Sequence, residues 1–153
     1  MPYRAPLDQY TLLLDHIVDF GQVARTDRFA EATRDTVRDI LTEAAKLCEG
    51  IMAPLNSVTD AHPAALENGV LRTAPGVPEA YKAIATGGWV GMSAEPKHGG
   101  MGLPMTVTTA VNEMMSAACL SLQLAPLMSQ GQIDALEHHA SDAIKDVYLP
   151  RLI

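Results

Sequence analysis

A glycine stretch is the first place where this sequence could perform chemistry. In Gly99-Gly100-Met101-Gly102, backbone N–H groups could approach an anion closely, as they do in phosphate-binding loops. The stretch lacks the Lys-Ser/Thr pair of a P-loop and does not follow a predicted strand. The preceding His98 makes it similar to the oxyanion-hole loop of some esterases, but that function requires a G-x-S-x-G motif, which the sequence lacks. We therefore interpret the glycines as a tight, packed loop.

Titratable side chains do not form an evident catalytic group either. His138 and His139 are neighbours, and neighbours on a helix point about 100° apart, so they are poorly placed to share a metal ion. Glu113 lies in an apolar stretch, where burial would raise its pKa and suit a general base, whereas exposure would leave it a surface group. The methionines could line a pocket for a flexible chain or simply fill the core; they are Met92, Met101, Met105, Met114, Met115 and Met128. For Glu113 and for the methionines, both of these interpretations stay open.

Composition narrows the class of protein. The chain has 153 residues, 48% of them hydrophobic, which is enough for one domain with its own core. A formal charge of -7 opposes binding to a phosphate backbone, so we expect no nucleic-acid partner. The sequence has neither the apolar region of a signal peptide nor a membrane span, so we expect a cytoplasmic protein. Cys48 and Cys119 fit reduced core positions.

Hydrophobic spacing predicts an all-α domain of about six helices in an orthogonal or up-down bundle. A first helix is expected along Leu13, Ile17 and Phe20, ending at Gly21. A longer amphipathic helix should begin at Thr26 or Asp27 and stop at Pro54. Its polar face carries opposite charges three residues apart, at 35/38 and 43/46.

The second half of the chain alternates helices with turns. Residues 55–75 are expected to wander over the surface with a turn at Asn68-Gly69, and no stretch alternates long enough to predict a sheet. Pro78 opens a short helix that closes at Gly87-Gly88. A structured loop over 89–104 then leads, at Pro104, into a core helix reaching Ala118. Two further helices are expected, over 121–140 and from Ser141 towards Pro150, with Pro126 starting or bending the first of them.

The glycine stretch, read with its flanks, resembles a loop of acyl-CoA dehydrogenases. The resemblance rests on segments that occur in the order typical of that family's N-terminal helical domain, namely 53–56 with Asp60, 88–91, Pro96, 99–104, the helix with Glu113, the Ser/Ala/Cys-rich turn 116–121, and 140–150. The opening Tyr3-Arg4-Ala5-Pro6 resembles a bacterial branch that includes methylthiopropanoyl-CoA dehydrogenases.

The resemblance implies an activity for a longer enzyme. In the family, N-terminal helices, a β-domain and a C-terminal helical domain together bind FAD and acyl-CoA. A glutamate base removes the α-proton while a hydride passes from the β-carbon to the flavin, and an electron-transfer flavoprotein accepts the electrons. Residues 1–153 would then be the N-terminal helical domain of a homo-oligomeric enzyme, with the base and the flavin contacts beyond Ile153. We expect this segment alone to hold no FAD and to be inactive.

The resemblance also implies which residues would touch substrate. The inner wall of the family's acyl pocket comes from the helix after the Ser/Ala/Cys turn, and the matching positions are Gln123, Leu124, Leu127, Met128 and Gly131. Their spacing places them on one side of a helix, provided that Pro126 starts or only bends it. This face lacks a charged floor and therefore suits a hydrocarbon or thioether chain.

A different class of function remains as the alternative. The chain could be a stand-alone helical module whose glycine loop and methionine-rich face bind a partner protein. A coding sequence that continues past Ile153 into a β-rich segment and a second helical bundle would favour the enzyme.

Overall fold

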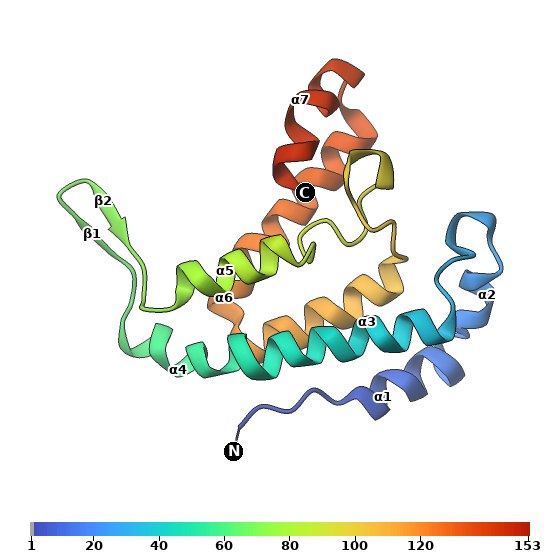
Figure 1. Cartoon of the computed structure of the whole chain (residues 1–153), viewed down its shortest axis with the longest axis horizontal. Helices are drawn as coiled ribbons and strands as arrows, with labels where there is room; N and C mark the ends of the chain where they lie inside the picture. Colours follow the sequence, from blue (N-terminus) through green and yellow to red (C-terminus); the bar gives the residue numbers. More distant parts are fainter. Residues whose placement is uncertain (1) are drawn as a thin grey trace.

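The computed structural model describes residues 2–153 and is mostly helical. Two long layers run side by side in Figure 1: a nearly continuous helical rod made of α3 (Arg34–Leu47), a π-helix, η3 (Cys48–Met52), and α4 (Ala53–Ala61), and behind it the first part of α6 (Met105–His139). The second part of α6 turns away from the rod and packs with α7 (Asp142–Leu152). The helical fold class expected from the sequence is confirmed.

The N-terminal helix differs from its prediction. Helix α1 (Leu7–Leu12) begins directly after Pro6 but continues as a π-helix, η1 (Leu13–Ile17), where a regular helix was expected. The wider π turn changes the phase of the side chains, so Ile17 is 71% exposed although the sequence pattern placed it towards the core. Gly21 lies inside the next helix, α2 (Phe20–Ala24), instead of ending the first. Phe20 itself is buried, as expected.

The long amphipathic helix also has different ends. Thr33, rather than Thr26 or Asp27, caps α3, with its Oγ1 accepting the N–H of Thr36 at 3.2 Å. The segment near Asp27 is a short 3₁₀ helix, η2 (Asp27–Phe29). Pro54 does not stop the rod, because the π-helix ends just before it and Pro54 occupies the first turn of α4, where a missing N–H is tolerated.

The segment predicted to wander is partly ordered into a hairpin. Strands β1 (Ala65–Glu67) and β2 (Val70–Arg72) pair antiparallel, with Leu66 opposite Leu71. The turn between them is the predicted Asn68-Gly69, whose φ values of 52° and 77° suit a tight hairpin. The sequence missed these strands because they are too short to show an alternating pattern. Figure 1 shows the hairpin projecting from the body.

The remaining elements surround the glycine loop. Helix α5 (Val77–Thr86) has Pro78 in its first turn and is followed by Gly87, as predicted. The loop then runs irregularly to Pro104 and contains one short 3₁₀ helix, η4 (Pro96–His98). Helix α7 begins after Ser141 and carries Pro150 within its last turn, so that proline does not end it.

A sharp bend divides α6 and decides where the candidate site lies. Cys119 has φ -158° and ψ 92°, which are extended rather than helical values. The helix therefore consists of a first segment, 105–118, and a second segment, 120–139, at the Ser/Ala/Cys-rich turn identified from the sequence. Pro126 lies inside the second segment near its start and is buried.

Candidate functional site

Residues 99–103 of the glycine loop do not offer their backbone donors to an anion. Their N–H groups bond to carbonyl oxygens of the loop itself: Gly100 to Glu95 (3.2 Å), Met101 to Gly91 (3.0 Å) and Gly102 to Ala94 (2.9 Å). Leu103 N likewise donates to Met92 O at 2.8 Å. A phosphate cradle needs such groups to point outward, so the loop does not fit the pyrophosphate of a dinucleotide. The packed-loop interpretation is the one that the structure supports.

The isolated titratable candidates do not gather into a catalytic site. Glu113 is exposed, and His138 instead accompanies Asp134, its Nδ1 lying 3.4 Å from Oδ1 of that carboxylate. Across residues 2–153 there is no group of three or more His, Cys, Asp or Glu side chains that could hold a metal ion. Cys48 and Cys119 are buried as free thiols.

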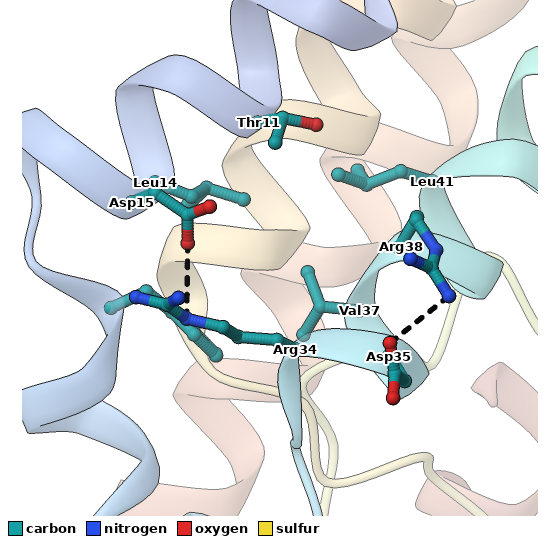
Figure 2. Close-up of a pocket in the computed structure, with 9 residues that line it drawn as sticks. Thr11, Leu14, Asp15, Arg34, Asp35, Val37, Arg38 and Leu41 are labelled. Atoms are coloured by element: carbon teal, nitrogen blue, oxygen red, sulfur yellow. Dashed lines mark ion pairs between the residues drawn. The ribbon is translucent and has the colours of Figure 1, made fainter.

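A hollow between α1 and α3 is lined by charged groups that already have partners. Figure 2 shows this cavity of about 200 Å³, in which Arg34 pairs with Asp15 at 3.1 Å and Arg38 with Asp35 at 3.0 Å. The second of these is an i,i+3 pair predicted from the sequence. Since each of these charges faces its partner and water, the hollow offers no unmatched group for a ligand.

The predicted acyl-wall residues divide into two sets. Leu124, Leu127 and Met128 are 50%, 41% and 66% exposed, and the exposed Gly131 lies beside them on the second segment of α6. Gln123 is instead fully buried on the side that faces the rest of the domain. The structure thus brings four of the five residues onto one open apolar surface, which Leu120, 54% exposed, extends by one turn. We call Leu120, Leu124, Leu127, Met128 and Gly131 the open face.

The methionines follow the same division. Met92, Met114 and Met115 are fully buried in the core, whereas Met101 and Met105 are exposed beside the glycine loop. Of the set identified in the sequence, only Met128 belongs to the open face. The methionines therefore do not line one common pocket.

Beside the open face, about a quarter-turn around the helix, the second segment carries a row of polar side chains that sequence reasoning missed. Gln123, Gln130 and Glu137 are spaced by seven residues, or about two helical turns, so they lie on one side. Gln123 Nε2 donates to Asn112 Oδ1 at 2.9 Å, and Asn112 Nδ2 donates to Gln130 Oε1 at 2.7 Å. Glu137 Oε1 accepts the N–H of Glu95 in the glycine loop at 2.7 Å. We call Gln123, Gln130 and Glu137 the polar seam.

The seam and Ser121 together connect the second segment to three other parts of the domain, namely the first segment, the glycine loop and α4. Gln130 Nε2 also donates to the carbonyl oxygen of Trp89, at 3.2 Å, at the start of the glycine loop. At the bend, Ser121 Oγ donates to Thr59 Oγ1 of α4 at 3.0 Å. Amides seven residues apart in an apolar helix were a usable signal, because such groups are buried only when hydrogen-bonded.

An apolar hollow of about 430 Å³ borders the same bend on another side. It lies between the end of α4, the hairpin, α5 and the second segment, and its lining includes His62, Tyr81 and Leu122. Its neighbouring hydroxyls, Ser121 and Thr59, are bonded to each other. Its lining shares no residue with the open face.

The bent helix, the glycine loop and the order of elements define the class of protein. Residues 27–153 match the family described as acyl-CoA dehydrogenase, N-terminal domain, and the chain belongs to this family. Helices α3 to α7, including both faces of the second segment, lie within the matched range.

One relative shares sequence along the whole chain. The 3-methylmercaptopropionyl-CoA dehydrogenase of Ruegeria pomeroyi (strain ATCC 700808 / DSM 15171 / DSS-3) is 37% identical over 153 residues, which is 100% of this chain. The chain spans 26% of the length of that relative. Among residues 2–153, no helix is both long enough and apolar enough to cross a membrane.

Proposed function

We propose that this chain is the N-terminal helical domain of a longer, FAD-dependent acyl-CoA dehydrogenase, in which it forms part of the wall around the acyl chain. The observation that carries the proposal is the open face. Four apolar side chains and a glycine lie along one side of a helix that is otherwise held firmly by its polar seam. Such a surface is unusual for a finished exterior and suits an apolar ligand or a covering domain.

The proposed contribution of this chain is binding rather than bond breaking. Leu124, Leu127 and Met128 would contact the acyl chain and exclude water from its length. None of them can hold or move a proton, and Glu113 lies on the first segment, outside the open face. The base that removes the α-proton, and the flavin that takes the hydride, would therefore belong to the remaining part of the enzyme. FAD supplies the two-electron acceptor when it is bound there.

The relative's substrate suggests the class of acyl chain. The printed name of the Ruegeria protein specifies a 3-methylmercaptopropionyl thioester, a short chain that ends in a thioether. An apolar face with Met128 and no charged residue is compatible with a thioether, because sulfur is polarizable and weakly hydrated. We propose a short apolar or thioether acyl-CoA as substrate, an electron-transfer flavoprotein as electron acceptor, and a cytoplasmic homo-oligomer as the working enzyme.

The experiment compares the full-length gene product with the 153-residue chain. The full-length protein is expected to be yellow and to reduce an electron acceptor when a short acyl-CoA is added, and the short chain is expected to do neither. FAD retention or turnover by the short chain would overturn the assignment. A coding sequence that ends at Ile153 would instead favour the stand-alone interaction module.

A pair of substitutions tests the wall itself. In the full-length enzyme, Leu127→Glu should raise the KM for acyl-CoA about tenfold or more, because a carboxylate would face an apolar chain. Leu66→Glu, on the exposed hairpin, is the matched control for adding a charge at an exposed leucine. Equal effects of the two substitutions on KM, with flavin absorbance unchanged, would remove the open face from the binding site.

A further inference from the structure

The bend at Cys119 leaves the direction of the second segment to be set by side chains. A continuous α-helix is oriented by its own backbone ladder, but an extended residue interrupts that ladder. Pro126 removes another backbone donor shortly afterwards. The rotation of the second segment about its own axis therefore depends on what its polar seam contacts.

Asn112 is the residue that these contacts share. Its side chain lies on the first segment and bonds to two members of the polar seam, accepting from Gln123 and both donating to and accepting from Gln130, at 2.9, 2.7 and 3.3 Å. Gln123 and Gln130 bracket most of the open face. One amide thus fixes both ends of the stretch that presents Leu124, Leu127 and Met128.

The orientation of each amide follows from a backbone carbonyl. Trp89 O can only accept, so it fixes the NH₂ of Gln130 towards itself, and Gln130 Oε1 is left to accept from Asn112 Nδ2. Asn112 Oδ1 must then face Gln123 Nε2. The chain of bonds ends at Gln123 Oε1, which is buried without a partner. Because the orientation of each amide follows from that of its neighbour, the network specifies a single arrangement.

We infer that Asn112 is a positioning residue that sets the placement of the open face and thereby the acyl-chain length that the enzyme prefers. This inference rests on the proposed function. Asn112 lies on the first segment and bonds to the amides that flank the open face, so it would act through Gln123 and Gln130 and not by touching substrate. Its loss would leave the buried Nε2 of Gln123 and the half-buried Oε1 of Gln130 without their partner, and the second segment would rotate or shift to rehydrate them.

The test is the chain-length profile of the full-length enzyme. Activity is measured with a series of straight-chain acyl-CoA thioesters, and the ratio of kcat/KM between the best substrate and one two carbons longer is compared among variants. Asn112→Leu is expected to change this ratio about tenfold, because a shift of the wall by a fraction of an ångström alters the fit of each methylene. Asn112→Asp keeps the acceptor for Gln123 Nε2 but turns a carboxylate oxygen towards Gln130 Oε1, so it should change the ratio in the same direction as Asn112→Leu.

Two further variants separate positioning from general stability. Gln130→Met breaks the same connection from the other side and should change the ratio in the same direction, which keeps the test open if Asn112→Leu does not fold. Gln9→Leu, at an exposed amide of α1 with no side-chain bond among the described contacts and away from the open face, should leave the ratio unchanged. If Asn112 has only a structural role, its variants will have a lower melting temperature but the same chain-length ratio of kcat/KM as the parent. This result would overturn the inference. A parent enzyme without any acyl-CoA dehydrogenase activity would overturn the proposed function, and the inference with it.

Discussion

Gly100 lies directly against the backbone carbonyl of Ala94. A β-carbon at Gly100 would stand 2.1 Å from that oxygen, well inside contact distance. The carbonyl is not free to move, because Gly102 N donates to it at 2.9 Å. The conformation of the glycine loop thus depends on the absence of a side chain at this position.

Replacing this glycine should damage the loop. Gly100→Ala is expected to lower the free energy of unfolding by about 2–3 kcal/mol, because an overpacked backbone contact must be relieved by shifting the chain. Gly50→Ala is the matched control, since a β-carbon there would meet nothing within 4 Å. Gly50 is helical, so alanine should stabilise it by about 0.5–1 kcal/mol. Urea unfolding checks both values, and equal effects of the two substitutions would contradict the packing argument.

The buried amides should differ in what their removal costs. Asn112→Leu leaves Gln123 Nε2 and Gln130 Oε1 without partners and should cost about 2–4 kcal/mol of unfolding free energy. Gln123→Met removes one bond but also removes the unpartnered Oε1, so it should cost less than about 1 kcal/mol. Thermal and urea unfolding measure the difference. A larger loss of unfolding free energy for Gln123→Met than for Asn112→Leu would show that Asn112 is not the residue on which these hydrogen bonds depend.

Local patterns in the sequence predicted the fold well where short-range chemistry decides it. Asn68-Gly69 forms the expected turn, Pro78 opens the expected helix, and the loop after Trp89 stays irregular. Prediction failed at the two π-helices. The wider turn over Leu13–Ile17 breaks the 3.6-residue period, and the one over Cys48–Met52 lets Pro54 follow without ending the rod.

The sequence also predicted only part of the candidate site. The spacing of Leu124, Leu127 and Met128 identified the open face, but the spacing alone could not show that Gln123 turns inward. That orientation depends on Asn112, which precedes the bend and is eleven residues earlier in the chain. Contacts between two segments of a bent helix are tertiary, so no helical period reports them.

Glu49 holds the N-terminal lead against the rod. Its Oε1 accepts the N–H of Ala5 at 3.0 Å and its Oε2 pairs with Arg4 Nη1 at 2.5 Å. The Ala5 N–H and then the Arg4 guanidinium lower the pKa of this carboxyl below its ordinary 4.5. The stabilisation is therefore complete above pH 4.5 and is lost as the pH falls through the lowered value.

Removing this carboxylate should release residues 2–6. In Glu49→Ala, the Ala5 amide is expected to exchange its hydrogen severalfold faster, because a charge-assisted bond is lost. Glu43→Ala, which breaks an exposed pair with Lys46, should leave that exchange rate unchanged. Hydrogen exchange followed by NMR at neutral pH measures both. An unchanged rate in Glu49→Ala would mean that other contacts hold the lead in place.

Tyr10 should make the domain sensitive to alkali. Burial, and then the negative charge of Glu113, raise the pKa of its hydroxyl from 10.0 to about 12. The folded state therefore binds this proton more tightly than the unfolded state, so its contribution to stability is complete below pH 10 and is lost as the pH rises towards 12. The free energy of unfolding, measured in urea at intervals from pH 9 to pH 12, should fall less steeply in Tyr10→Phe than in the parent.

Tyr148→Phe, at a tyrosine that is 53% exposed, is the matched control and should retain most of the parent's slope. If Tyr10→Phe and the parent lose stability in parallel over this range, the Tyr10 hydroxyl does not ionise out of a buried site.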